Sequence, residues 1–270
     1  MSEPRVPGPP ATDRVPFRGG GFEPAGRRWA SWLAFAVIIL LWQISSSTGL
    51  LSPAAMPSPL EVVNALWGLA ASGKLGFHLA QSLYRIGLGW LIGTSAGLAV
   101  GLAMGIFSVA RAIGIPITAA IFPIPKIALL PLFIVWFGIG ESAKVATIAL
   151  GVFFPTVISA YSAVDNVPRN LIRMGQSFGL PASSIVAKIV LPGAMPGILA
   201  GFRISSSIAL ILVVAAEMIG AEYGIGAFIL AAGNLMQTDQ LIAGVVMLSL
   251  LGLAISVVLG ILERRLLRWR

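Results

Sequence analysis

Six apolar segments, each about 20 residues long and each with at most two charged side chains, dominate this chain. A stretch of about 20 apolar residues has the length that crosses the hydrocarbon core of a bilayer as a helix. In lipid the backbone polar groups must be satisfied within the protein, which helices achieve. The pattern predicts an all-α integral membrane protein with about six transmembrane helices. Their expected ranges are 29–47, 83–107, 112–137, 145–164, 197–219 and 241–262.

The composition excludes several classes of protein. Charged residues make up 10% of the chain, where soluble domains carry roughly 25%, so there are too few charges to cover a water-facing surface. The net charge is +8, but the arginines lie at segment ends and in the tails, which indicates membrane orientation rather than nucleic-acid binding. No phosphate-binding G-x-x-x-x-G-K-[ST] motif occurs. With 0 cysteines and one histidine, His78, we expect no metal site and no catalytic residue.

Lysine and arginine distinguish the two sides of the membrane. Three lie in the segments expected outside: Lys74, Arg85 and Lys144. Twelve lie in the segments expected inside: Arg14, Arg18, Arg27, Arg28, Arg111, Arg169, Arg173, Lys188, Arg264, Arg265, Arg268 and Arg270. Cytoplasmic segments carry the excess of such residues, so both termini and the segment 165–192 are expected in the cytoplasm.

Residues 1–28 are rich in Pro, Gly and Arg and are expected to form a disordered cytoplasmic tail. The transmembrane domain is then expected over 29–270. A signal peptide is the alternative, but the apolar run after Trp29 is longer than the roughly 7–15 residues of a signal core. Further along, Ser58-Pro59-Leu60-Glu61 is typical of a helix start and predicts a short outer helix to Ala71.

The second span contains five glycines at four-residue spacing, which place a nearly bare stripe along one side of the helix. Glycine permits the close backbone approach that holds helices together in lipid. We interpret the stripe mainly as a packing surface, with a substrate-lining role as the alternative. Its members are Gly89, Gly93, Gly97, Gly101 and Gly105.

Two ionisable residues lie in apolar surroundings, Lys126 and Glu217, and Arg203 lies on nearly the same helical face as Glu217. A charge in the bilayer centre costs at least ~2.5–3.5 kcal/mol on insertion scales, so such residues face the protein interior or water. One interpretation is that they line a translocation path; the other is that they fix helix packing. Lys126 lies in the third span, which four prolines interrupt: Pro116, Pro123, Pro125 and Pro131.

The segment 165–192 is predicted to form a helix-turn-helix, which we call the elbow. Its first helix reaches Gly179, which can adopt the positive φ that ends a helix. Pro181 suits the first turn of the second helix, which is expected to end at Leu191-Pro192.

The elbow resembles the signature loop of ABC-importer permeases, in which E-A-A is followed by three residues, Gly, nine residues and Ile-x-Leu-Pro. The residues at the matching spacings are Gly179, Ile189, Leu191 and Pro192. The E-A-A positions instead hold Arg173, Met174 and Gly175. Because the family's loop docks onto an ATP-hydrolysing subunit, the resemblance implies that these seven residues form an ATPase-coupling elbow.

Other stretches are similar to the nitrate/sulfonate/taurine branch of these permeases: Ser82–Arg85, Ile127–Pro131, Trp136–Glu141, Val214–Met218 and Leu262–Trp269. The resemblance implies a multi-pass subunit of the bacterial inner membrane that forms the path for a small anionic solute delivered by a substrate-binding protein. It also implies a homodimer with two cytoplasmic ATPase subunits, which would hold ATP and Mg, while this chain binds no cofactor and is not an enzyme. The alternatives are another solute such as a pyrimidine or thiamine precursor, a secondary transporter, or a membrane-embedded enzyme.

Overall fold

The structure is a computed structural model that describes residues 28–49, 52 and 55–268, and every regular element in these ranges is helical. The predicted all-α class is therefore confirmed. The chain divides into two compact units, Met1–Leu51 and Ser52–Arg270. In the first unit, α1 covers Arg28–Ser47, as predicted for the first span. The tail predicted for residues 1–28 lies, except for Arg28, outside the described residues.

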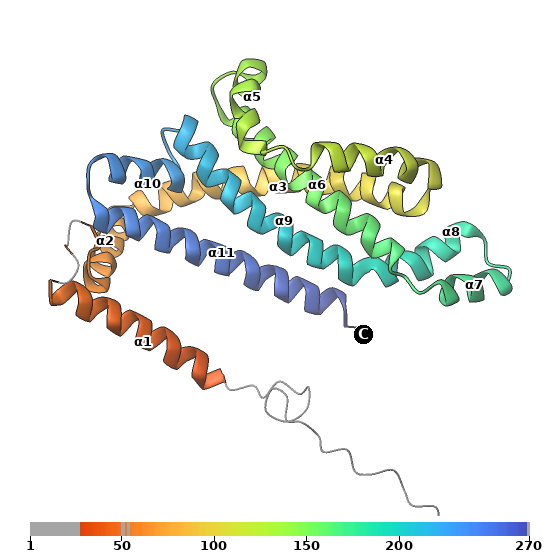
Figure 1. The fold of residues 1–270 in the computed structure, drawn as a ribbon, viewed down its shortest axis with the longest axis horizontal. Helices are drawn as coiled ribbons and strands as arrows, with labels where there is room; N and C mark the ends of the chain where they lie inside the picture. Colours follow the sequence, from red (N-terminus) through yellow and green to blue (C-terminus); the bar gives the residue numbers. More distant parts are fainter. Residues whose placement is uncertain (1–27, 50–51, 53–54, 269–270) are drawn as a thin grey trace, which may run out of the picture. The chain divides into compact units, whose positions relative to one another are not determined.

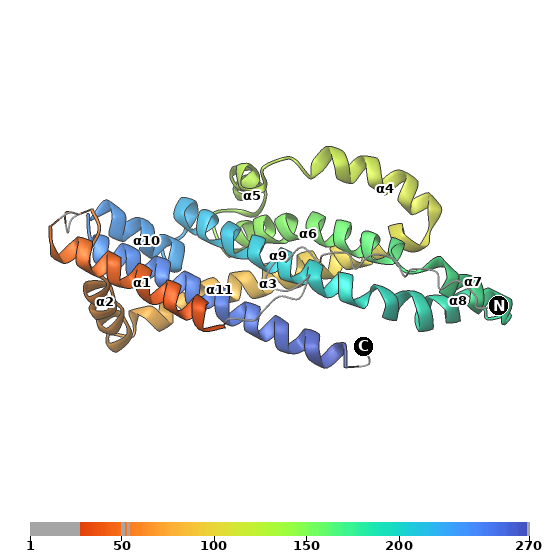
Figure 2. The ribbon, with the colours of Figure 1, turned by 60° about the horizontal axis from the view of Figure 1, so that its bottom comes forward.

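The second unit contains the remaining helices (Figures 1 and 2). They are α2 (Pro59–Ala71), α3 (Lys74–Ile106), α4 (Ser108–Ile121), η1 (Lys126–Leu129), α5 (Leu130–Phe137), α6 (Glu141–Asp165), α7 (Arg169–Ser177), α8 (Ala182–Ile185), η2 (Val186–Val190), α9 (Leu191–Gly220), α10 (Ile225–Asn234) and α11 (Thr238–Leu266). The short helix α2 begins as predicted, because Ser58 and Glu61 form a reciprocal capping box.

Four helices of the described chain are long and apolar enough to cross a membrane: α3, α6, the continuous helix Ala182–Gly220, and α11. A fifth crossing exists if α4 and the helix Lys126–Phe137, which meet at 85°, are counted as one broken span. Pro123 and Pro125 lie in this break. Proline lacks the N–H of the helical ladder, so the interruption expected from the sequence occurs here.

The prediction that the second elbow helix ends at Leu191-Pro192 is wrong. The helix instead continues from Ala182 to Gly220. A π-helical turn, Val186–Val190, directly precedes Pro192 and directs the Leu191 N–H to the Val186 carbonyl. A π-helical turn is wider than an α-helical turn and can accommodate a residue that disturbs the regular hydrogen bonding. The helix therefore continues through Pro192 without a break.

The stretch between the last two predicted spans, residues 220–240, contains the helix α10. The polar residues Glu222 and Asp239 flank this helix, and Asn234 is its last residue. Between them the sequence is apolar, and Ile225, Ala227 and Ala232 are buried. The polar residues of this stretch therefore lie at the ends of α10, and its middle is apolar and partly buried.

The glycine stripe of α3 lies against α6, and the two helices run alongside each other in both views (Figures 1 and 2). A Cβ atom added at Gly97 would lie 2.6 Å from the Phe153 carbonyl oxygen and 2.9 Å from Thr156 Cβ. Cβ atoms in proteins essentially never come this close to another atom. Only glycine therefore allows the backbones of α3 and α6 to approach each other at this distance. On its other side α6 packs against α9, with Ile148, Val152 and Val213 fully buried.

We expect Gly97→Leu to separate α3 from α6 and to lower the yield of folded protein in mild detergent. Overpacking of a filled core costs about 1–3 kcal/mol, and here the obstruction is partly backbone. Gly76→Leu is the matched control, because Gly76 lies in the same helix and a Cβ there meets nothing within 4 Å. Equal yields and melting temperatures for the two variants would contradict this packing role.

Candidate functional site

The turn of the elbow is closed by a Schellman motif. The Leu180 N–H donates to the Gly175 carbonyl at 3.1 Å, and the Gly179 N–H donates to the Gln176 carbonyl at 2.9 Å. This motif requires a residue in the left-handed conformation just after the end of the helix. Gly179 occupies that position, with the predicted positive φ of +70°. Pro181 then precedes α8, as expected. These two backbone hydrogen bonds therefore hold the turn between the two elbow helices.

The two elbow helices contact each other through Gly175. A Cβ at Gly175 would lie 2.9 Å from Ile189 Cδ1, and Ile185 is buried beneath the same contact. Beside this contact the elbow exposes apolar side chains: Met174 of α7 is 50% exposed, and Phe178, the C-cap residue of α7, is 77% exposed. The elbow therefore has a fixed interior and an apolar outer surface.

Lys126 lies at the break between α4 and η1 and is 9% exposed. Its Nζ donates to the carbonyl oxygens of Ile121, Phe122 and Ile124 at 2.8, 3.0 and 2.6 Å. It also lies 5.0 Å from the centre of the Phe154 ring. An ammonium has three donors, so this lysine caps the carbonyl end of α4, where the helix dipole favours a positive charge.

Glu217 belongs to a buried ion cluster that joins α3, α6, α9 and the start of α10. Its side chain forms an ion pair with Arg85 Nη1 at 2.6 Å, and the two side chains are 0% and 3% exposed. The Ser82 hydroxyl donates to the same carboxylate at 2.8 Å, and so does the Gly226 N–H, also at 2.8 Å. The latter donor lies in the first turn of α10, where an anion is stabilised by the helix dipole.

The other side of Arg85 faces α6. Glu141 accepts from Arg85 Nε and Nη2 at 2.6 and 2.8 Å, a bidentate arrangement, and Lys144 Nζ donates to the same carboxylate at 3.1 Å. Arg85 Nη1 also donates to the Tyr223 carbonyl. Gly224 closes the cluster at a φ of +133°, and a Cβ there would overlap the Glu217 carboxylate. The positive charges of Arg85 and Lys144 thus balance the negative charges of Glu141 and Glu217.

The structure does not bring the three predicted path residues together. Glu217 is held in the cluster, and Lys126 is bound to carbonyls. Arg203 Nη2 pairs with Glu263 of α11 at 2.8 Å, and the Arg203 side chain is 51% exposed. His78 Nδ1 lies 3.0 Å from the Gly224 carbonyl oxygen. Among the residues that the structure describes, no group of three or more His, Cys, Asp or Glu side chains could hold a metal ion.

Sequence reasoning missed the ion cluster, although the signal for it was present. Arg85 and Lys144 were assigned to outer segments, yet both are buried. Three of the stretches that carried the family resemblance contribute to the ion cluster. They are Ser82–Arg85, Trp136–Glu141 and Val214–Met218. The pairing could not be read from the sequence, because Arg85 lies 56 residues from Glu141 and 132 residues from Glu217.

Residues 92–268 match the family of binding-protein-dependent transport system inner membrane components. The chain belongs to this family, and it is a permease subunit of an ABC importer rather than an enzyme. Permeases of this kind work with ATPase and substrate-binding partners.

Relatives with named transport roles match nearly the whole chain. A protein of Escherichia coli named as the aliphatic sulfonates transport permease SsuC is 38% identical, over 90% of this chain and 92% of its own. Its namesake in Bacillus subtilis is 34% identical, over 91% and 90%. The taurine transport system permease protein TauC of Escherichia coli is 36% identical, over 87% of both chains.

Solved structures share the fold. The inward-facing MetNI methionine ABC transporter aligns with a TM-score of 0.59 at 22% identity, over 78% of this chain and 99% of that chain. An amino acid ABC transporter aligns with a TM-score of 0.60 at 16% identity, over 74% and 97%. At these identities the likeness concerns the fold alone.

Removal of one partner from the buried cluster should strongly destabilise the protein. Breaking a buried ion pair costs about 3–5 kcal/mol, because the remaining charge stays buried. We therefore expect Glu217→Ala to lower the melting temperature in detergent far more than Glu263→Ala. The latter removes the partly exposed pair with Arg203, and such pairs contribute about 0–1 kcal/mol. Similar melting temperatures for the two variants would show that the cluster does not stabilise the fold.

Proposed function

We propose that this chain crosses the membrane six times, with both termini and the elbow in the cytoplasm. The crossings are α1, α3, the broken helix α4–α5, α6, the helix Ala182–Gly220 and α11. Within the second unit, the elbow and α10 lie at opposite ends of the helices (Figures 1 and 2). The excess of lysine and arginine supports a cytoplasmic location for the elbow end.

The elbow is proposed to be the surface that couples the permease to its ATPase. The observation that carries this proposal is the exposed apolar face of α7 at the end of a continuous helix. That helix has 39 residues, about 58 Å at ~1.5 Å per residue, whereas the hydrocarbon core is only about 30 Å thick. The helix is therefore too long to lie wholly in lipid, and the excess of lysine and arginine assigns the elbow end to the cytoplasm. The exposed apolar side chains there, Leu171, Met174 and Phe178, suit a protein partner.

The complete transporter is proposed to contain two copies of this permease, two ATPase subunits and an external substrate-binding protein. ATP and Mg are assigned to the ATPase subunits, and this chain to the path itself. The absence of a phosphate-binding motif from the sequence supports this division of roles. Energy must then enter the chain mechanically, through a surface outside the membrane.

The substrate is proposed to be a small organic anion of the sulfonate class, such as taurine or an alkanesulfonate. The named relatives at 34–38% identity support this class. A direct test is uptake by proteoliposomes that hold the whole transporter, with labelled taurine, ethanesulfonate and a pyrimidine precursor offered in turn. We expect uptake of a sulfonate that depends on ATP and on the binding protein. Uptake of the pyrimidine precursor alone would contradict the assignment.

Gly179→Val should uncouple the ATPase from the permease. A β-branched residue disfavours the left-handed conformation by roughly 1–2 kcal/mol, and it would alter the angle between the elbow helices. We expect normal membrane insertion but weaker ATPase binding, or hydrolysis that the loaded binding protein no longer stimulates. The measurements are subunit stoichiometry and stimulated ATP hydrolysis in the reconstituted complex.

Gly73→Val is the matched control for backbone strain. Gly73 has a similar φ, +73°, and, like Gly179, has nothing within 4 Å of an added Cβ. It lies at the turn between α2 and α3, away from the elbow. Equal loss of stimulated hydrolysis in both variants would assign the effect to general destabilisation, and unchanged stimulation in Gly179→Val would overturn the coupling role.

Lys126 is proposed to supply positive potential to the anion path at the break between α4 and η1. Lys126→Glu reverses the charge beside three carbonyl oxygens, so we expect uptake to be abolished. Lys126→Arg retains the charge and should preserve part of the activity. Both are measured in complexes whose assembly has been verified. Normal uptake by an assembled Lys126→Glu complex would remove this residue from the path.

A further inference from the structure

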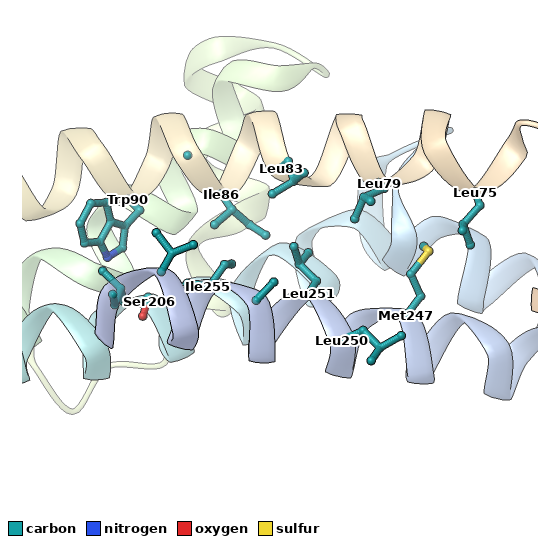
Figure 3. Close-up of a pocket in the computed structure, with 14 residues that line it drawn as sticks. Leu75, Leu79, Leu83, Ile86, Trp90, Ser206, Met247, Leu250, Leu251 and Ile255 are labelled. Carbon is teal, nitrogen blue, oxygen red and sulfur yellow. The ribbon is translucent and has the colours of Figure 1, made fainter. Parts of the chain in front are cut away.

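The groove between α3 and α11, about 650 Å³ in volume, offers an anion no free hydrogen-bond donor (Figure 3). Of the side chains that line it, only those of Trp90 and Ser206 carry a polar group, and both already donate within the protein. Arg85, the neighbour of Ile86 in this wall, donates instead to a residue of α6. An anion therefore finds its binding partners on the α6 side of α3.

Arg85 and Lys144 are two buried cations that share the carboxylate of Glu141. Their side chains are 3% and 7% exposed, whereas that of Glu141 is 43% exposed. Arg85 Nε and Nη2 donate to the two carboxylate oxygens, and Lys144 Nζ donates to one of them. In the described chain Lys144 has no other hydrogen-bond partner, although an ammonium has three donors. The exposed member of this group is thus the anion, and the cations lie beneath it.

The Glu141 side chain borders open space. It follows the link Gly138–Gly140 between α5 and α6, in which Ile139 is 87% exposed. A Cβ built on Gly138 or on Gly140 meets nothing within 4 Å. Rotation of its own side chain is therefore enough to turn the carboxylate into water, and a solute can approach the two cations from the same side.

Glu141 must stay in place while nothing replaces it, because its departure would leave two buried charges without their partner. A second oxyanion in the same position removes this requirement, since Arg85 and Lys144 then remain paired. Two oxygens of a sulfonate fit the N–H fork of Arg85 as those of a carboxylate do, and its third oxygen can accept from Lys144. A neutral solute cannot make this exchange.

We propose that Arg85 and Lys144 form a transient binding site for the sulfonate headgroup, which Glu141 occupies at rest and leaves when the substrate enters. This inference rests on the proposed function, because it takes the α10 end as the outer end and a sulfonate as the solute. The tethered carboxylate competes with the substrate, so binding is weak and the anion can leave again, as conduction requires. Glu217 keeps its ion pair with Arg85 Nη1 during the exchange, so the helices stay together.

The test measures the accessibility of the Glu141 carboxylate in the unaltered permease, purified with its ATPase subunits in phosphatidylcholine nanodiscs without nucleotide or binding protein. A carbodiimide couples glycine ethyl ester to accessible carboxylates, and mass spectrometry locates the product. We expect saturating methanesulfonate, at constant ionic strength, to at least double the coupling rate at Glu141, because the paired side chain is only 43% exposed. Dimethyl sulfone, in which a methyl group replaces the charged oxygen, should leave the rate unchanged.

Glu263 is the matched control within the same chain. Its side chain is 34% exposed and pairs with Arg203, which is itself 51% exposed. A general effect of added anions on ion pairs would raise the coupling rate at Glu263 as well, because this pair is open to solvent on both sides. An increase at Glu141 alone supports the site, whereas an equal increase at both residues, or none at Glu141, overturns it.

Glu141→Gln tests the two cations without their competitor. Methanesulfonate should raise the melting temperature of this variant at a concentration about tenfold lower than the one that exposes Glu141 in the parent, because no tethered carboxylate competes. Addition of Lys144→Gln should raise that concentration again by about tenfold, the value of a hydrogen bond to a charged group. Addition of Lys74→Gln, which removes an exposed lysine at the start of α3, should not. Equal effects of the two lysine changes would overturn the role of Lys144, and if Glu141→Gln does not fold, the measurement on the parent decides.

Binding at this site and uptake by the whole transporter can fail separately, since the coupling measurement needs neither ATP nor the binding protein. Sulfonate uptake without any change at Glu141 would overturn the site and leave the proposed substrate standing. A response of Glu141 to methanesulfonate in a transporter that takes up only a pyrimidine precursor would overturn the proposed function and the role of this site in transport.

Discussion

The buried pair of Arg85 and Glu217 is the interaction on which the helix arrangement depends. Both side chains are withdrawn from water, and an unpaired charge at such a place costs several kcal/mol. Every partner must therefore stay in position: the Ser82 hydroxyl, the Glu141 carboxylate and the N–H groups that begin α10. Since these partners belong to α3, α6, α9 and α10, one electrostatic requirement fixes four elements at once. In the described part of the chain no buried side-chain nitrogen or oxygen lacks a partner.

Close packing extends this fixed arrangement from the ion cluster along the length of α3 and α6. The stripe from Gly89 to Gly105 lets the two backbones touch over about 24 Å at ~1.5 Å per residue. At the elbow end, Arg111 of α4 and Asp165 of α6 form an ion pair at 2.7 Å. Together with the packing of α6 against α9, these contacts form the packed centre of the second unit, to which the broken helix and the elbow are attached.

The continuous helix Ala182–Gly220 connects the elbow to the ion cluster. A π-helical turn keeps it unbroken past Pro192, so a displacement at Ile185 and Ile189 is carried along one element toward Glu217. This continuity gives the proposed coupling role a mechanical basis, because force applied to the elbow by an ATPase would reach the far end of the helix.

The sequence by itself determined the helical class, the apolar helices, the broken third span and the Gly179 turn, because these follow from hydropathy, proline chemistry and positive φ within short stretches. It also marked the glycine stripe as a packing surface, but not its partner α6. Only the tertiary structure decided that Arg85 pairs with Glu217, that Lys126 caps α4, and that α10 is a helix. The pairing of Arg85 with Glu217 joins residues 132 apart in the chain. The Lys126 cap depends on how the backbone turns at the break between α4 and η1, and periodicity and composition report neither. The sign of its charge could not show that Lys126 binds carbonyl oxygens, since this depends on where the folded chain places three oxygen atoms.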